Sequence, residues 1–589
     1  MKTKNETKIE YLEKLGGQLE LQRTTHDDQA KQLAENILPS RIRQFNSDQN
    51  RGHRLYGKII DPAASVAART GAAGRMSGMS SPARSWFELE HPNQELMKLY
   101  RVKRWLADSS EVLRRIMAQS NMYTTLYNVY LDYPTFGTAA FMIEPDTEDV
   151  ILCRDFPWGS YYIGQDARNR VNIFRRKFQM SVRQIVEEFG MDEKGDIDWT
   201  NISDFTKNSY ERGHTEVWVD VNHFILPNDD YDNGKSESKY KKFASCYYES
   251  GGGGGGVGKS FDSQSTGAFN GGKFLRESGY DYFPVLVARS GLTEGDVYAT
   301  DSPGMMALGT VKALQIKHKE RARAIKKMID PPMNAAGIAK GTKLSILSGD
   351  VNFVPRGESA VFSPAYQFNF DVSKMDEDIR ADHAQISRIY HEDTFRMMLD
   401  DERAQRATAA EVYAKQQERM LDLGPELERN NQDVFDPAIN IIFTLANEAG
   451  LLDEPPPELQ GQVLRIKYVS VMALAQKASN IGGYERYLGT LSAMAKISPD
   501  IMDNMDGDKF VMKYGEMLSV SPEVYRDPEE VAAMRQARAK QMAQKQAVEQ
   551  IAQGAGAVKD LSQAGMEEDS ALTRLTQAAN AGRLVNGAA

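Results

Sequence analysis

The sequence predicts an α+β protein built from several domains. Strand-like runs occur between residues 136 and 289, and on either side of them lie helical runs whose apolar residues recur every three or four positions. At 589 residues the chain is too long for a single hydrophobic core. In addition, a Pro331-Pro332 break separates two long helical patterns, which makes a helix pair the expected centre of the architecture.

Composition narrows the class of protein. The hydrophobic fraction of 41% and the charged fraction of 26% are typical of globular proteins, and a formal net charge of −10 argues against a surface built throughout to grip nucleic acid. The cysteines Cys153 and Cys246 are far apart and lack metal-ligand spacing, which suits a reducing cytoplasm. Without an apolar signal-peptide core or a run of about 20 apolar residues, the chain is expected to be soluble.

The N-terminal third is predicted to hold three kinds of segment. Residues 1–40 are expected to form a polar, loosely held helix. The Gly/Ala/Ser/Arg-rich stretch 41–85 favours an irregular arm of the kind that packs over neighbours in oligomers. Two helices should follow, over 93–107 and 109–132.

A mixed α/β body is expected next. A short helix is predicted from Ser181 to Phe189, closed by Gly190. The basic triplet Arg175-Arg176-Lys177 is interpreted as a solvated strand edge rather than a DNA site, because side chains alternate faces on a strand. The predicted strands cover 136–143, 215–225, 242–248 and 283–289, with a meander over 153–178 that turns at 164–169.

The first helix of the central pair is predicted to begin near Ser302-Pro303-Gly304, where a hydroxyl can cap and Pro suits the first helical position. Residues that recur at three- and four-residue steps share one narrow face of this helix, its stripe: Val311, Leu314, His318, Ala322, Ile325 and Ile329. Basic side chains cover much of the remaining surface, namely Lys312, Lys317, Lys319, Arg321, Arg323, Lys326 and Lys327.

The second helix is predicted to begin near Ser373, with Asp376 three residues on as a candidate capping box. Its stripe consists of Met375, Ile379, His383, Ile386 and Tyr390. Its acidic start, which the helix dipole favours, consists of Asp376, Glu377, Asp378 and Asp382. A basic and an acidic helix flanking a compact excursion should pack as an antiparallel pair or against copies of themselves, which describes a scaffold rather than a catalytic cleft.

Helices dominate the C-terminal part. One is predicted over 436–449, ending at Gly450, and a closing strand over 461–469. The Met-rich segment 472–518 is expected to be helical, with its Met stripe used for core packing. A last helix over 529–551 has almost no apolar stripe and is stable only in a bundle or ring, and the tail 554–589 is expected to be partly disordered.

Signals of catalytic or ligand chemistry are weak. Gly253 to Ser260 satisfies the phosphate-loop pattern G-x-x-x-x-G-K-[ST], but the residues after it do not predict the helix that would cradle phosphate, so a surface loop is favoured over ATP binding. His383 and His391 are eight apart and could share a helix face, yet no zinc spacing exists. Residues 503–508 fail the calcium-loop pattern. We therefore predict no catalytic, cofactor or metal site.

Several stretches resemble a known family. Ser302 to Leu308 (SPGMMAL) is similar to the stretch that opens the stem helix of portal proteins, the head-to-tail connectors of short-tailed, podovirus-type bacteriophages. Arg406 to Val412 is similar to their (R)xTAxEV helix start, and Glu418 to Arg429 matches their ERxxxLGPxLxR segment. Similar stretches also lie between Tyr161 and Gly190 and at Tyr468-Val469-Ser470.

The resemblance spans about residues 40–541 and is weakest in the Gly-rich loop and the tail. It implies a portal fold with a mixed α/β wing, a two-helix stem, a small α/β clip, a helical crown and a C-terminal helix. The implied domains are an N-terminal helix and irregular arm (1–92), the wing (93–300), stem helix 1 (301–330), the clip (331–370), stem helix 2 (371–400), the tunnel loop with wing-closing helices (401–469), the crown (470–527) and a barrel-like helix with a flexible tail (528–589).

The resemblance also implies a function without enzymatic activity. The chain would form a dodecameric ring at one capsid vertex of the virion, assembled in the host bacterial cytoplasm, and double-stranded DNA would pass through its channel. The implied partners are terminase, the major capsid and scaffolding proteins, a tail adaptor and internal core proteins, with no membrane. Two rivals remain, a P-loop nucleotide-binding protein and a non-viral ring or filament scaffold.

Two sets of charged residues are candidates for contacts in that ring. The tunnel-loop set, which would face the DNA or else form a solvated helix junction, consists of Asp400, Asp401, Glu402, Arg403 and Arg406. The clip set, which would face the adaptor and terminase, consists of Lys340, Lys343 and Arg356.

Overall fold

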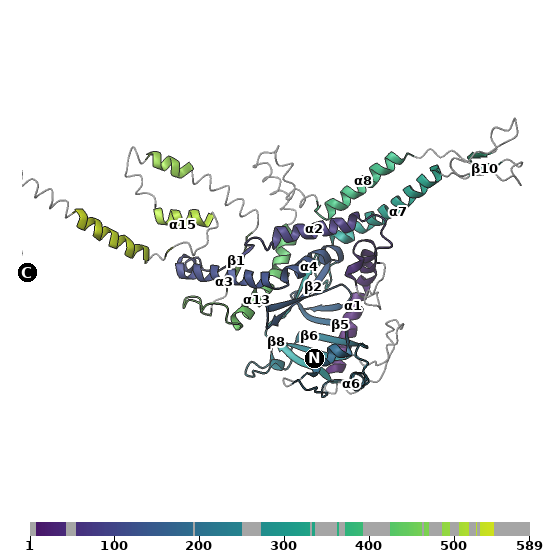
Figure 1. Ribbon diagram of the computed structural model, residues 1–589, viewed down its shortest axis with the longest axis horizontal. Coiled ribbons are helices and arrows are strands. Elements are labelled where there is room, and N and C mark those ends of the chain that lie inside the picture. Colours follow the sequence, from purple (N-terminus) through teal and green to yellow (C-terminus); the bar gives the residue numbers. More distant parts are fainter. Residues whose placement is uncertain are drawn as a thin grey trace, which may run out of the picture. The chain divides into compact units, whose positions relative to one another are not determined.

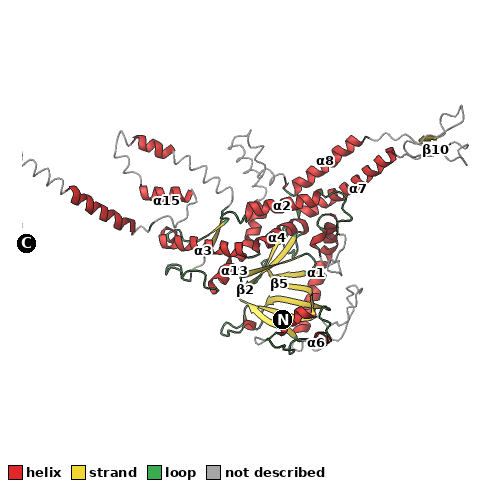
Figure 2. Cartoon of the chain, in the orientation of Figure 1, coloured by secondary structure: helices red, strands yellow, loops and turns green. Residues whose placement is uncertain are grey.

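A computed structural model shows how the chain folds (Figures 1 and 2). It describes residues 7–42, 55–191, 195–249, 273–329, 333–335, 362–364, 371–392, 424–461, 464–469, 486–494, 506–517, 526 and 530–546. The chain divides into two compact units: Met1–Pro92, Leu106–Pro455 and Gln462–Asn480 make up the first, and Asn93–Trp105, Pro456–Gly461 and Ile481–Ala589 the second. Helices and antiparallel sheets occur together, which confirms the predicted α+β class.

The largest sheet of the first unit has five antiparallel strands in the order β4-β5-β6-β7-β8. Asp166 forms the turn between β4 and β5, because its Oδ1 accepts the N–H groups of Arg168 and Arg170 at 2.8 and 2.9 Å. This confirms the predicted turn at 164–169. The five strands are β4 (Tyr161–Gln165), β5 (Val171–Ser181), β6 (Trp218–Pro227), β7 (Phe243–Glu249) and β8 (Phe274–Tyr280).

A second sheet has β2 (Thr138–Asp146) between β3 (Val150–Phe156) and β9 (Val285–Arg289). The first six residues of β2 are all buried, as expected of a central strand. The meander predicted over 153–178 is therefore divided between two sheets, because the chain turns between β3 and β4 at Gly159, whose φ is 97°.

Helix α1 (Lys8–Asn36) covers one face of the five-stranded sheet and opens with a capping box at Thr7. Ile9 and Leu12 pack with Phe224, Cys246 and Tyr248 from that face. On the same helix, Arg23 is buried, pairs with Asp27 at 3.0 Å and donates to the Tyr161 carbonyl at 2.5 Å. The expectation of a loosely held N-terminal helix is wrong, because α1 buries a stripe of apolar residues together with the Arg23–Asp27 pair.

The basic triplet of β5 lies inside the sheet rather than at its edge. Arg175 is buried under α1, with its guanidinium 5.4 Å from the Phe224 ring centroid and 3.5 Å from the Glu20 carboxylate. Arg176 stacks over the Phe178 ring at 4.0 Å, and burial lowers its pKa to about 10. The predicted solvated edge is wrong, since β5 lies between β4 and β6 and aromatic rings shield both guanidinium groups.

The opposite face of the sheet is covered at one end by the short helices α5 (Val182–Ile185) and α6 (Asp204–Glu211) and the π-turn η3 (Val186–Gly190). Ser181 and Gln184 form a capping box that opens α5, which confirms the predicted helix after Ser181. His223 of β6 lies on this face, with its Nε2 2.9 Å from Ser245 Oγ and its ring stacked at 3.7 Å on Tyr247. Burial, and then the charges of Arg176, Arg276 and Arg154, hold the pKa of His223 well below its usual value.

We expect His223 to make the fold sensitive to acid. The unfolded histidine binds a proton near pH 6.5 and buried His223 does not, so the unfolded state takes up more protons as the pH falls below that value. The free energy of unfolding should therefore drop by about 2 kcal/mol between about pH 6.5 and about pH 5 from this group. Urea titrations of the wild type and His223→Gln at both pH values should show a smaller drop in the variant. His214→Gln, at an exposed site, should behave as the wild type; an unchanged drop in His223→Gln would contradict the assignment.

Helix α2 (Ala63–Met79) takes up 17 residues of the stretch 41–85, for which an irregular arm was predicted. It is rich in Gly and Ala, whose small side chains allow close packing against α4 and α8. At Gly71 an added Cβ would lie only 2.9 Å from the Tyr390 carbonyl oxygen. The prediction of an irregular arm is thus wrong here, because the alanines favour a helix and close packing at the glycines offsets their low helix propensity.

Two further helices follow with a different boundary from the predicted one. Helix α3 (Tyr100–Gln119) continues through Ser109, and α4 (Met122–Phe136) begins only after Ser120 and Asn121. Helix α4 is almost wholly buried and ends at Gly137, whose φ is 85°. It thereby feeds directly into β2.

Helix α13 (Asp436–Glu448) ends before Gly450, whose φ is 68°, which confirms the predicted helix. The predicted closing strand is β12 (Arg465–Tyr468), paired antiparallel with β1 (Phe87–Glu90). In the second unit, described helices cover 486–494, α15 (Gly507–Met517) and 530–546. Met494 and Met512 are 50% and 38% exposed, so at these positions the Met stripe does not form a core within the chain. No helix among the described residues is long and apolar enough to cross a membrane.

Candidate functional site in the two-helix stem

The stem consists of α7 (Pro303–Ile329) and α8 (Val372–Ile389), both in the first unit. Ser302 Oγ accepts the N–H of Met305 at 3.2 Å and Pro303 is the first helical residue, which confirms the predicted start. Gly304 packs against the backbone of Thr135 in α4, where an ideal Cβ would lie 2.3 Å from the carbonyl oxygen. The Ser-Pro-Gly sequence therefore both begins α7 and fits it onto the body.

Helix α8 begins one residue earlier than predicted. Asp371 is its N-cap and accepts the N–H groups of Ser373 and Lys374 at 3.0 and 3.4 Å. The predicted capping box is wrong, because Ser373 lies inside the helix and Asp376 pairs with Arg321 instead. The stripe predicted for this helix is confirmed, since each of its members is buried or partly buried.

Ion pairs join the two helices along their length. Arg321 Nε lies 2.5 Å from Asp376 Oδ1, and Lys317 Nζ lies 2.7 Å from Asp382 Oδ2. Residue numbers rise along α7 as their partners fall along α8, so the helices are antiparallel and lie side by side, as Figure 1 shows. This confirms the predicted antiparallel pair. Because these side chains are partly exposed, each pair stabilises by at most about 1 kcal/mol, and their arrangement matters mainly for register.

The stripe predicted for α7 is only partly correct. Val311 and Leu314 are buried, whereas Ala322 and Ile329 are exposed and Ala324 is buried in their place. The helix changes partners along its length, from α4 and α1 near its start to α8 further on. The predicted stripe assumed that one face of α7 packs against one partner along the whole helix. Because the partner changes, the buried face changes too.

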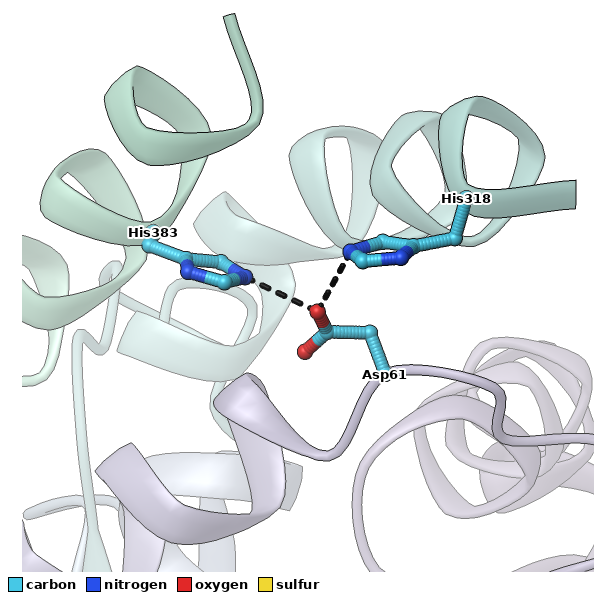
Figure 3. A group of neighbouring side chains, drawn as sticks. All are labelled: Asp61, His318 and His383. Carbon is cyan, nitrogen blue, oxygen red and sulfur yellow. Dashed lines mark hydrogen bonds and ion pairs between the residues drawn. The ribbon is translucent and has the colours of Figure 1, made fainter. Parts of the chain in front are cut away.

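Two stripe histidines meet a carboxylate that precedes α2. Asp61 Oδ2 lies 2.6 Å from His318 Nε2 and 2.9 Å from His383 Nε2, so both rings point at one oxygen (Figure 3). Asp61 Oδ1 accepts the N–H of Ala63 at 2.7 Å, and the Asp61 side chain is 8% exposed. The idea that His383 shares a helix face with His391 is wrong, because His391 follows the end of α8 with a φ of 57°.

Gln315 of α7 holds the segment that carries this carboxylate. Its Oε1 accepts the N–H groups of Ile60 and Asp61 at 2.8 and 2.9 Å, and its Nε2 donates to the Asp61 carbonyl at 2.8 Å. Sequence reasoning missed Asp61 because it is 257 positions from His318. The one signal in the sequence was that the predicted stripe of each stem helix contains a histidine, His318 in α7 and His383 in α8.

A second polar network lies where α2, α4 and α12 (Gly424–Asn430) meet. Arg75 Nε lies 2.7 Å from Glu426 Oε1, Tyr133 Oη donates to the same oxygen, and Asn430 Nδ2 donates to Tyr133 Oη at 3.1 Å. Although burial opposes it, the Arg75 guanidinium holds the pKa of Glu426 below its usual value. The LGPELER segment singled out in the sequence thus supplies Glu426 to this network, and Arg429 to the Ser290 carbonyl.

All eight predicted contact residues lie outside the described part of the chain. Of the excursion between the stem helices, the structure describes β10 (Met333–Ala335) and β11 (Phe362–Pro364), which pair antiparallel. The residues outside it are Lys340, Lys343 and Arg356 of the clip set, Asp400, Asp401, Glu402, Arg403 and Arg406 of the tunnel-loop set, and the phosphate-loop match at 253–260.

The stem is thus an antiparallel, ion-paired helix pair on an α+β body. The family model described as bacteriophage head to tail connecting protein matches residues 10–525 of this chain. The chain is 38% identical over 578 residues to a portal protein of Salmonella phage epsilon15, covering 98% of this chain and 99% of the relative. It is 34% identical over 563 residues to a probable portal protein of Bordetella phage BPP-1, covering 95% and 97%. The chain belongs to the bacteriophage head to tail connecting protein family, which confirms the resemblance found in the sequence.

Proposed function

We propose that the chain forms the portal ring of a short-tailed phage, a dodecamer at one capsid vertex through which DNA enters and leaves the head. The observation that carries this proposal is the near full-length similarity to a portal protein and a probable portal protein, which extends over stem, body and C-terminal part alike. In this proposal the ring itself does no chemistry. It guides DNA that another protein's ATPase drives.

The described surface supports assembly with further copies. Met306, Ile316 and Ile329 of α7 are 64%, 61% and 78% exposed, and neighbouring copies in a ring would cover them. Residues 530–546 form a helix that is exposed on nearly all sides. Such a helix is stable when it packs in a bundle, and symmetry-related copies of the same helix would provide one.

The same proposal assigns roles to the charged sets outside the described residues. The tunnel-loop set would face the duplex, and the clip set would contact terminase during packaging and the tail adaptor afterwards. The excursion that carries the clip set begins and ends with the β10–β11 pair at the far end of the stem helices, which suits a docking surface at one end of a ring.

The test is the mass of the purified chain by native mass spectrometry, with and without ATP, followed by electron microscopy of the particles. We expect a closed ring of about a dozen subunits that ATP does not change. Because some rings form only on a scaffold, the same chain should also be imaged in virions, where it should occupy one vertex. A chain that binds ATP as a small species, and is absent from that vertex, would overturn the proposal in favour of the phosphate loop.

A further inference from the structure

The cluster of Asp61, His318 and His383 has the geometry of a ligand set. The three side chains come from separate segments, the residue before α2 and one residue in each stem helix, and they point toward one another (Figure 3). Their ligand atoms all lie within 4.8 Å of one another. His318 Nε2 is buried and makes no hydrogen bond, although Asp61 Oδ2 is only 2.6 Å away. A ring nitrogen that close to an oxygen, without an aligned N–H, is arranged better for a shared cation than for a hydrogen bond.

The donor types define the class of ion. Two imidazole nitrogens and one carboxylate oxygen suit Zn²⁺ and related first-row divalent ions, and they suit Ca²⁺ and Mg²⁺ poorly. Asp61 can offer one oxygen only, because Ala63 N–H occupies the other. Bonds of about 2.0–2.1 Å to a four-coordinate ion place ligand atoms roughly 3.3 Å apart. Asp61 Oδ2 lies 2.6 and 2.9 Å from the two Nε2 atoms, so each of these separations needs to widen by less than about 1 Å.

We propose that Asp61, His318 and His383 form a site for one divalent transition-metal ion of the zinc class in each subunit. The His318 and His383 side chains are 26% and 41% exposed, which leaves room for water as a fourth ligand. Gln315 fixes the backbone at Asp61 by three hydrogen bonds and so orients the carboxylate. The neighbouring Lys317 is neutralised by Asp382.

The ion would act as a structural clamp. It would tie the segment before α2 to both stem helices at once, a junction that is otherwise held by hydrogen bonds and partly exposed ion pairs. The proposal goes beyond the portal function and does not depend on the ring, because all three residues belong to one chain.

The full-length chain, stripped with a chelator and dialysed, is the material for the test. Co²⁺ is added first, since four-coordinate Co²⁺ with nitrogen and oxygen ligands gives a strong visible absorption. Zn²⁺ is then titrated in competition, and metal content is measured by mass spectrometry. We expect one equivalent per subunit, and a rise in the melting temperature with Zn²⁺.

Matched variants locate the ion. His383→Gln and Asp61→Asn should each weaken binding at least tenfold, and Asn at 61 can still accept the Ala63 N–H, so the fold should be kept. His214→Gln, at an exposed histidine outside the cluster, should bind as the wild type. Circular dichroism verifies the fold of each variant. If the wild type takes up no Co²⁺ or Zn²⁺, or if His383→Gln takes up as much as the wild type, the cluster is a metal-free hydrogen-bonded group and the proposal is wrong.

Discussion

Gly304→Ala is expected to destabilise the first unit by about 3 kcal/mol, although Ala is the better helix former. The added Cβ would lie 2.3 Å from the carbonyl oxygen of Thr135 and 2.8 Å from its Cα. Backbone atoms cannot rotate away as a side chain can, so α7 must shift against α4. That shift would also disturb the Ser302 cap and the hydrogen bond from Ser302 Oγ to the Thr135 carbonyl.

Gly309→Ala on the same helix provides the matched control. Nothing lies within 4 Å of an added Cβ there, so the change should stabilise the helix by up to about 1 kcal/mol. Urea titrations of the two variants and the wild type should therefore move in opposite directions. Equal effects at both positions would mean that helix propensity alone decides, and that the Gly304 contact is not a constraint on the stem.

The elements that the sequence predicted well are those decided by local chemistry. The capping box at Ser181, the Ser302-Pro303 start of α7 and the turn at Asp166 each depend on residues within a few positions of one another. The basic α7 and the acidic α8, joined by a compact excursion, were expected to pack as an antiparallel pair or against copies of themselves, and the Arg321–Asp376 and Lys317–Asp382 pairs confirm the first alternative.

The elements that were missed depend on contacts between distant segments. Helix α2 combines alanines, which favour a helix, with glycines, which do not, and only its packing against α4 and α8 shows why small residues suit it. The basic triplet of β5 was interpreted as an edge, because nothing near Arg175 in the sequence announces that α1 covers it. The histidines of the stem were placed in the helix stripes, and His383 was compared only with His391, because the carboxylate that His318 and His383 face precedes them by more than 250 residues.

Removing the guanidinium of Arg75 is expected to cost more than any surface change in the chain. Arg75→Met leaves Glu426 and the Tyr133 hydroxyl facing each other without the buried cation, and breaking such a pair costs about 3–5 kcal/mol. The pKa of Glu426, which Arg75 now holds below its usual value, should rise in the variant. The loss should consequently be larger at neutral pH than in mild acid, where protonated Glu426 is no longer an uncompensated charge.

A second substitution separates the pair from the packing of the long side chain. Glu426→Gln in the Arg75→Met background removes the stranded charge and keeps a group that can bond Tyr133, so the double variant should recover a large part of the loss. Arg69→Met, an exposed change on the same helix, should stay within about 0.5 kcal/mol of the wild type in the same urea titrations. If the double variant is instead as unstable as Arg75→Met, the segment 424–430 is held to α2 by packing around the aliphatic part of Arg75. In that case the charge of Arg75 is not what joins α2 to Glu426, which lies 351 positions further along the chain.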